Sequence, residues 1–326
     1  MASTALLALL SAILLLSSSG DGYGLSKRIV GGTLSTRGQW PWLVSLHMIK
    51  RSPDVEDVPY VLPKELVEKI DKFLAKAFPS QDLRVGTMSP KMLTLLLEKL
   101  KTSQSVSKHQ PTFEGHMCAG SLINEQWVLS AKHCFNKATD VNLTDDASRW
   151  TAELGEHSLS GIDGHERSHR ISKIIMHEPL DVVVENDIAL IKLSEPVEFT
   201  RHIRPITLAT PAETYEPGKI CAVAGWGHTT YEGEMSDEIM HIHIPLLSKR
   251  DCDPLSKVNE NEFCAGGGVE DACQYDSGGP LVCLKDGVYE QLGIVARGRG
   301  CGDGHGGVYT DVRGHLRWIL ETMASN

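Results

Sequence analysis

Eight cysteines restrict what this chain can fold into more than any other feature. They are Cys118, Cys134, Cys221, Cys252, Cys264, Cys273, Cys283 and Cys301. No two of them have the C-x-x-C spacing that is typical of metal and redox sites, so they favour four disulfide bonds in an oxidising compartment. Because eight cysteines can pair in 105 ways, the spacing alone leaves the pairing open.

The first twenty residues agree with such a compartment. An apolar run at residues 5–16 leads into small residues that suit signal-peptidase cleavage, and the run is too short to span a bilayer. We therefore interpret residues 1–20 as a signal peptide. We expect a secreted, extracellular protein without a membrane anchor.

Length and charge exclude several classes of protein. The chain has 326 residues, of which 41% are apolar, which suffices for one large two-lobed domain or for two ordinary ones. A disordered or fibrous protein is excluded by this composition. The net charge of -10 argues against nucleic acid as a partner.

Most of the chain has the pattern of short strands. From Cys118 onward, runs such as WVLSA, DIALIKL and YEQLGIVA alternate with turns rich in Gly, Pro and Asn. This spacing favours an all-β barrel or sandwich. The pattern changes at residues 315–323, where we expect a closing helix with Leu316, Leu320 and Met323 on one side.

Residues 48–115 have a different pattern. Two apolar stripes at helical spacing follow a first strand at residues 39–46 and predict a helical hairpin. The stripes consist of Leu66, Ile70, Phe73, Leu74 and Ala77, and of Met92, Leu93, Leu96, Leu97 and Leu100. Such an insertion could gate access to a site or bind a partner, or it could be a misjoined exon, and the sequence leaves both open.

Three motifs carry a candidate chemistry. They are LSAKHC with His133, ENDIALIKL with Asp187, and CQYDSGGP with Ser277. A serine is a weak nucleophile at neutral pH and needs a positioned base, which a histidine supplies when a carboxylate orients it. Together with IVGG, CAGSLI and GWG in the same order, these motifs resemble the chymotrypsin/trypsin-like serine peptidases. The resemblance covers nearly everything from Ile29 except the insertion.

The resemblance implies a fold and a mechanism. The fold is two six-stranded Greek-key β-barrels packed together with a C-terminal helix, in a peptidase domain at residues 29–326 with the insertion in the first barrel. Ser277 would be the nucleophile, His133 the general base and Asp187 the residue that orients it. The N–H groups of Tyr275 and Ser277 would form the oxyanion hole. No cofactor is required, and the substrates would be proteins or peptides.

Activation by cleavage is also implied. Residues 21–28 would form a propeptide that an activating trypsin-like peptidase removes at Arg28. The new ammonium group of Ile29 would then pair with Asp276, because a buried charge needs a partner. We expect the product to be a monomer.

The resemblance selects one pairing of the cysteines and a substrate pocket. The pairs would be Cys118–Cys134, Cys221–Cys283, Cys252–Cys264 and Cys273–Cys301. Asp271 would form the base of the pocket between walls that contain Gly298 and Gly307, and a buried carboxylate there selects Arg or Lys.

Two surface features complete the expectations. The loop GEHSLSGIDGHE resembles the calcium loop of the family, and its expected ligands are Glu156, Ser158, Gly161, Asp163 and Glu166. Calcium prefers such oxygen ligands. Asn142 begins an N-glycosylation sequon.

Four residues depart from the family pattern. Tyr275 replaces a glycine, which predicts either strain at a positive φ or a ring over the leaving-group side of the cleft. Lys132 would lower the pKa of His133 unless it points outward. Ala296 lacks a hydroxyl that would help to hold Asp187, and Arg297 puts a cation near the pocket, so we expect a weaker preference for basic residues. The alternative function is a catalytically impaired homologue that acts as a binding module.

Overall fold

The computed structural model of the protein describes residues 31–50, 112–136, 143–180, 185–212, 214–252 and 254–326. The expected signal peptide and propeptide, with Arg28 and Ile29, lie outside the described residues. So do the two expected helices of the insertion and the sequon at Asn142. Among the described residues, no helix is long and apolar enough to cross a bilayer.

The first half of the fold is a closed barrel. Its strands follow the order β2-β3-β4-β7-β6-β5. They are β2 (Leu43–Lys50), β3 (Thr112–Leu122), β4 (Trp127–Ser130), β5 (Trp150–Leu154), β6 (Arg167–Met176) and β7 (Ala189–Leu193). Two short 3-10 helices, η2 (Lys132–Cys134) and η3 (Ala147–Arg149), connect them. The interior is filled by apolar side chains such as Leu46, Leu129 and Leu190, which are fully buried.

The second half is an eight-stranded sheet. The main path runs β1-β10-β9-β12-β13-β14-β11, and β8 pairs with β13. The strands are β1 (Thr33–Leu34), β8 (Thr207–Leu208), β9 (Ile220–Gly225), β10 (Met240–Pro245), β11 (Glu262–Ala265), β12 (Pro280–Lys285), β13 (Val288–Arg297) and β14 (Gly307–Asp311), and the 3-10 helix η4 (Pro254–Ser256) precedes β11. A bridge between Leu246 and Ala265 joins the residue after β10 to β11, so the six longer strands return on themselves. The prediction of an all-β fold of the chymotrypsin type is confirmed.

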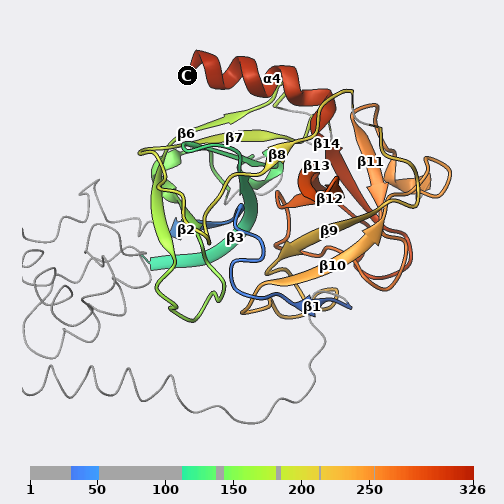
Figure 1. The fold of residues 1–326 in the computed structure, drawn as a ribbon, viewed down its shortest axis with the longest axis horizontal. Coiled ribbons are helices and arrows are strands. Elements are labelled where there is room, and N and C mark those ends of the chain that lie inside the picture. Colours follow the sequence, from blue (N-terminus) through green and yellow to red (C-terminus); the bar gives the residue numbers. More distant parts are fainter. Residues whose placement is uncertain (1–30, 51–111, 137–142, 181–184, 213, 253) are drawn as a thin grey trace, which may run out of the picture.

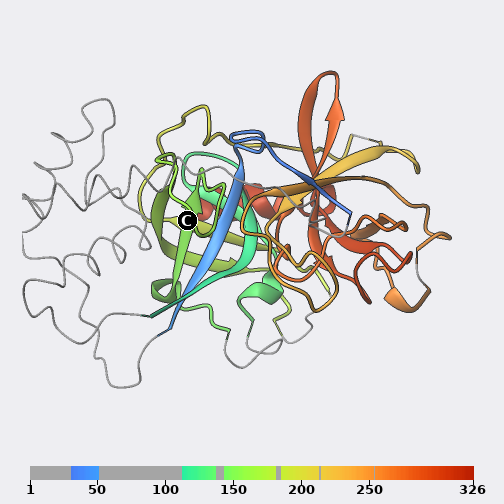
Figure 2. The ribbon, with the colours of Figure 1, turned by 90° about the horizontal axis from the view of Figure 1, so that it is seen from below.

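The two halves lie side by side and share a contact (Figures 1 and 2). Ala119 from β3 packs in one apolar cluster with Trp226 and Val282 from the second half. The hydroxyl of Ser121 donates a buried hydrogen bond of 2.6 Å to Oε1 of Gln291. The candidate site lies across this contact, because each half supplies part of it.

The insertion is shorter than predicted. β2 and β3 remain paired as far as Lys50 and Thr112, so residues 48–50 and 112–115 belong to the hairpin and not to the insertion. Two bulges change the register of this pairing, because Met117 and Glu114 of β3 have no partner in β2, which the alternation of apolar residues did not reveal. The chain therefore leaves and re-enters the barrel at two paired strand ends.

The closing helix α4 (Val312–Ser325) lies across one end of the molecule in Figure 1. It begins before the predicted residue 315 because the Asp311 side chain caps it by accepting from the N–H of Arg313. The predicted apolar side is correct at Met323, which packs against the core, and wrong at Leu320, which is 53% exposed, while Val312 and Ile319 are fully buried.

Candidate active site

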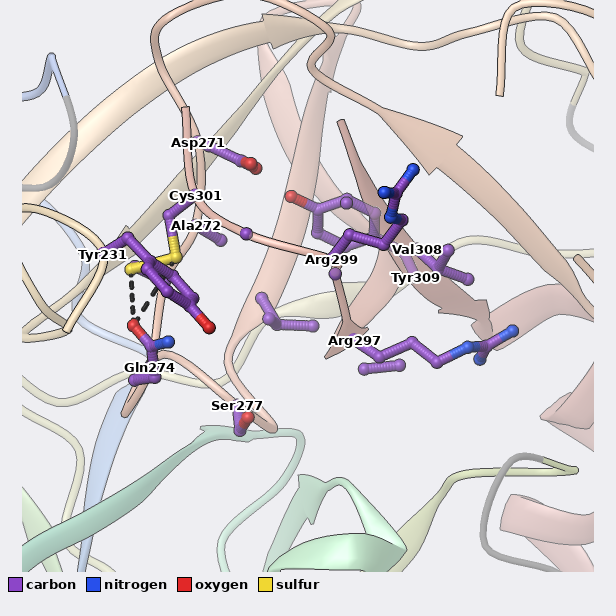
Figure 3. A pocket seen from close by; sticks show the side chains of 16 residues that line it. Tyr231, Asp271, Ala272, Gln274, Ser277, Arg297, Arg299, Cys301, Val308 and Tyr309 are labelled. Atoms are coloured by element: carbon purple, nitrogen blue, oxygen red, sulfur yellow. Dashed lines mark hydrogen bonds between the residues drawn. A yellow bond between two sulfur atoms is a disulfide. The ribbon is translucent and has the colours of Figure 1, made fainter. Parts of the chain in front are cut away.

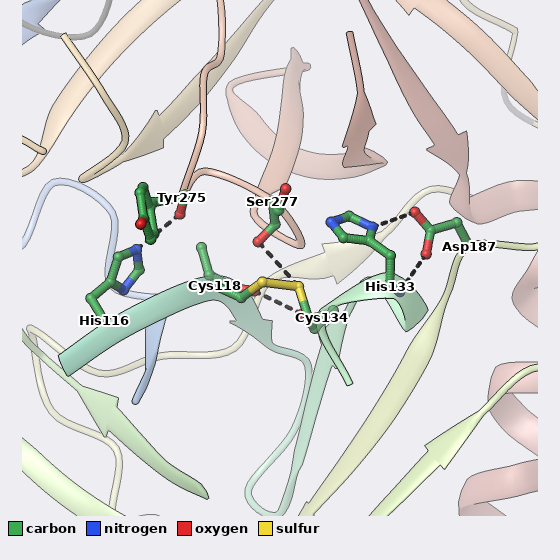
Figure 4. The surroundings of a disulfide bond; sticks show 9 residues. His116, Cys118, His133, Cys134, Asp187, Tyr275 and Ser277 are labelled. Atoms are coloured by element: carbon green, nitrogen blue, oxygen red, sulfur yellow. Dashed lines mark hydrogen bonds and ion pairs between the residues drawn. A yellow bond between two sulfur atoms is a disulfide. The ribbon is translucent and has the colours of Figure 1, made fainter. Parts of the chain in front are cut away.

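His133 and Asp187 form a close pair on the first barrel. His133 lies in η2, directly after β4, and Asp187 lies just before β7. The histidine Nδ1 is 2.6 Å from Oδ2 of Asp187, and its backbone N–H donates to Oδ1 at 2.8 Å (Figure 4). Burial lowers the pKa of His133, but the charge and the hydrogen bond of Asp187 outweigh it, so the pKa is raised from its usual value. The pair therefore holds one tautomer and favours a protonated imidazole.

Ser277 comes from the second half, in the tight loop before β12. Its carbonyl accepts a hydrogen bond of 2.8 Å from the N–H of Ala119 in β3, which fixes the loop against the first barrel. The disulfide Cys118–Cys134 lies beside both His133 and Ser277 (Figure 4). In the part of the chain that the structure describes, no hydrogen bond joins His133 to Ser277. Such bonds commonly tighten only when a substrate binds.

The other disulfides also have the pairs that the resemblance implies. Cys221 pairs with Cys283, Cys252 with Cys264, and Cys273 with Cys301. The last one forms part of the wall of a pocket that Ser277 also lines (Figure 3).

A cavity of about 210 Å³ extends from Ser277 to Asp271. Asp271 is 3% exposed, and its Oδ2 accepts from the N–H of Gly302 at 3.2 Å, while its buried Oδ1 has no hydrogen-bond partner among the residues that the structure describes. Burial raises the pKa of Asp271 to about 6, although two backbone N–H groups act against this. Gly298 and Gly307 line the same cavity, and a Cβ on Gly307 would lie 3.6 Å from Oδ1 of Asp271. The cavity thus ends in a buried carboxylate oxygen that lacks a donor.

Comparisons with known proteins agree with this geometry. The model of the trypsin family matches residues 99–319. The chain is 39% identical to human putative trypsin-6 over 219 residues, which is 65% of this chain and 81% of that protein. It is 38% identical to trypsin-1 of Salmo salar, over 64% of this chain and 82% of that protein.

The chain belongs to the trypsin family. It is a trypsin-like serine endopeptidase, a hydrolase that acts on protein substrates and needs no cofactor for catalysis. The four departures from the family pattern can now be placed in this peptidase.

Tyr275 has a positive φ of 74°, so the expectation of strain is the one that the backbone of the peptidase supports. Nε2 of His116 lies 2.9 Å from the carbonyl of Tyr275, and Nδ1 of His116 lies 2.7 Å from Oγ of Ser45. The ring of Tyr275 packs on His228, with the ring centroids 4.9 Å apart. Sequence reasoning missed His116, although it lies two residues before Cys118.

Asp276 is almost fully buried beside Tyr275. Its oxygens accept from the N–H groups of Gly227 at 2.8 Å and Cys273 at 3.0 Å, and burial raises its pKa to about 6. A Cβ on Gly225 would lie 2.2 Å from Oδ1 of Asp276, so glycine is required at this close approach. The expected partner, Ile29, lies outside the described residues.

Lys132 does not act as the sequence suggested. Its side chain is fully buried rather than turned outward, and Nζ donates to the carbonyls of Pro179 and Glu185 at 2.9 and 2.7 Å. The predicted lowering of the pKa of His133 is not found, because Asp187 determines the direction.

Arg297 is paired rather than free. Its guanidinium binds both oxygens of Glu262, at 2.5 and 2.8 Å. This pair largely compensates the cation that we expected to weaken the preference for basic residues. The missing hydroxyl at Ala296 is offset as well, since Asp187 accepts twice from His133.

The side chains of the expected calcium loop make other contacts in this structure. Asp163 pairs with Arg37 at 3.1 Å, and Glu166 accepts from the N–H groups of Asp163 and Gly164. Within the described residues, Glu156, Asp163 and Glu166 do not bring three ligand atoms together. Ser158 donates to Asp237, and Gly161 donates to Ser158. The carboxylates that calcium would need are already used within the protein.

For this reason, we expect that removing calcium with a chelator changes neither the stability nor the activity of the protein. Adding millimolar calcium or EDTA should leave the Tm and the rate of amide hydrolysis unchanged, because Arg37 and backbone N–H groups already satisfy the loop. Differential scanning calorimetry with and without calcium checks this. A rise in Tm of several degrees with calcium would show that the loop rearranges to bind the ion.

Proposed function

We propose that the protein is a secreted peptidase made as a zymogen, which after cleavage at Arg28 hydrolyses peptide bonds that follow Arg or Lys. The signal peptide would be residues 1–20, the propeptide residues 21–28 and the active monomer residues 29–326. The observation that carries the specificity is the buried Oδ1 of Asp271, which has no hydrogen-bond partner in the cavity that leads to Ser277. A guanidinium or ammonium group supplies the missing donor and charge.

The proposed mechanism assigns each step to a residue. Oγ of Ser277 attacks the scissile carbonyl while His133 takes the proton, and Asp187 holds the imidazolium that results. The N–H groups of Tyr275 and Ser277 bind the negative oxygen of the tetrahedral intermediate. His133 returns the proton to the leaving amine, and water then releases the acyl group by the same steps. These roles follow the template known for this family.

Zymogen control is part of the proposal. Asp276 is buried with two N–H donors and a raised pKa, so its charge needs a cation to be stable. The ammonium group of Ile29 would be that cation after cleavage. Pairing would fix the adjacent loop of Tyr275 and Ser277.

A fluorophosphonate probe tests the function directly. Protein cleaved at Arg28 should be labelled on Ser277, whereas uncleaved protein should be labelled much more slowly. Mass spectrometry of the labelled peptide identifies the serine. If cleaved protein takes up no label, the chain is instead an impaired homologue that acts as a binding module.

Tyr275 is expected to cost stability because of its backbone conformation. Tyr275→Gly should raise the free energy of unfolding by about 1 kcal/mol relative to Tyr275→Ala, since both remove the ring but only glycine accepts φ of 74° without strain. Urea unfolding of both variants measures the difference. Equal stabilities would contradict strain at this position.

The same two variants test crowding by the ring. If the ring limits access, glycine and alanine should increase the affinity for a protein inhibitor of trypsin to the same extent. Hydrolysis of a small arginine amide should change less than threefold in either variant, because the N–H of residue 275 is retained.

A further inference from the structure

A second cavity adjoins the Asp271 pocket. It has a volume of about 430 Å³, and Arg297, Gly298 and Arg299 line both cavities. Because three consecutive residues form the common wall, a peptide with one side chain in the first cavity brings its neighbouring residues close to the second. Figure 3 shows Arg297 and Arg299 on the β13 side of the pocket, away from Gln274.

Three of the seven residues that line the second cavity are cationic. Its polar and apolar side chains are those of Leu255, Ser256, Lys257, Asn259, Arg297 and Arg299, and none of the residues lining it carries a carboxylate. Lys257 and Arg299 are exposed. The chain as a whole has a net charge of -10, so this lining is opposite in sign to the rest of the protein.

Arg297 gives this cavity a fixed wall. Besides Glu262, it contacts the carbonyl of Ser256 at 3.1 Å, and Glu262 also accepts from the N–H of Asn259 at 2.8 Å. The Glu262 side chain is only 2% exposed, so its charge is used by Arg297 and does not face a ligand. Lys257 and Arg299 are the other two cationic side chains of the lining.

The position of the cavity indicates which part of a substrate it meets. The leaving amine departs toward His133 on the first barrel, whereas the acyl part stays on Ser277 with its side chain in the Asp271 pocket. The cavity lies in the second half of the fold, between β13 and the loop before β11. It thus faces residues that precede the scissile bond.

We propose that this cavity binds acidic side chains, so that the preferred substrates carry Asp or Glu shortly before the scissile Arg or Lys. This inference rests on the proposed function. Exposed charges attract a carboxylate modestly and are screened by salt, so the preference should be about tenfold and dependent on ionic strength.

Peptides of the form X-X-Gly-Arg, linked to a fluorogenic amine, test this with protein cleaved at Arg28. We expect kcat/KM to be about tenfold higher with X = Glu than with X = Lys at low salt, with Gln between them. The ratio should approach one in molar salt. A ratio of one at low salt overturns the inference.

Reversing the charges of two lining residues tests whether they cause the preference for acidic substrates. The double variant Lys257→Glu/Arg299→Glu should invert the ratio of the Glu to the Lys peptide, which is compared within each variant. Lys173→Glu makes the same kind of change on β6, far from the cavity, and should keep the wild-type ratio. An unchanged ratio in the double variant contradicts the proposal.

Binding separates this inference from the proposed function. If no peptide is hydrolysed, the proposed function is wrong, but the Ser277→Ala variant still reports affinity through the anisotropy of fluorescein-labelled peptides. Tighter binding of the Glu than of the Lys peptide supports the cationic cavity. Equal or no binding refutes it.

Discussion

Under the proposed mechanism, Ser277→Ala should lower kcat for an arginine amide by about 10⁵-fold or more, because the proposed nucleophile is lost while the pocket and the proposed oxyanion donors remain. KM or the affinity for a product peptide should stay within a few-fold of the wild type, since the Asp271 pocket that would hold the arginine side chain is unchanged. Stopped assays over many hours at high enzyme concentration give the residual rate.

The matched control is Ser160→Ala. Ser160 is exposed on the loop GEHSLSGIDGHE, and its backbone N–H donates a hydrogen bond to Asp237. This variant should keep full activity. If Ser277→Ala retains more than about one hundredth of the wild-type rate, another group is the nucleophile.

Asp271→Asn should reduce kcat/KM for arginine amides by about 10³-fold, since a buried guanidinium would lose its charged partner. Amides of Phe should be hydrolysed at a similar slow rate by the wild type and the variant. Steady-state kinetics on the two amides measure the ratio. A loss of equal size on both amides would show that the fold, and not the pocket, was damaged.

Asp271→Asn should also stabilise the protein without substrate, with the full gain above about pH 6. The pKa of Asp271 is about 6 in the folded protein, against 3.8 for the ordinary carboxyl group. As the pH rises from 4 to 6, the unfolded chain therefore loses this proton first, and the wild type loses stability across that window. Asn has no proton to lose, so the gain of Asp271→Asn should appear over this window and remain complete above pH 6. Thermal unfolding from pH 4 to pH 8 tests the sign.

We expect KM and kcat to depend on pH through two different groups, Asp271 and His133. Protonation of Asp271 below about pH 6 should raise KM for arginine amides in the wild type. The acidic limb of kcat should instead follow His133, whose pKa is raised by Asp187. In Asp271→Asn, KM should lose its dependence on pH in this range.

The sequence was most informative where a residue's role is tied to its immediate neighbours. His133 beside Cys134 and Ser277 within DSGGP could be found from local motifs, and the fold class from short strands and turns. The packed side of helix α4 could be read only in part, at Met323, because His315, a polar residue, takes a buried position there.

Contacts between distant segments were not predictable in the same way. Arg297 could be seen as a cation near the pocket, but its partner Glu262 lies 35 positions earlier with no local signal that links them. Lys132 likewise reaches carbonyl groups of Pro179 and Glu185, and any residue type offers a carbonyl. Only the fold brings such groups together, so the sequence reveals a charged side chain but not the groups that bind it.

The hairpin of β2 and β3 allows a segment to be inserted without interrupting the barrel. Because Lys50 and Thr112 are paired neighbours, the barrel ladder is complete on both sides of the segment between them. Evolution can lengthen, exchange or delete that segment while the catalytic framework stays intact, as long as the two strand ends remain together. The hairpin tip is thus a position at which the peptidase fold can acquire an added segment, and an engineer could graft a foreign domain there for the same reason.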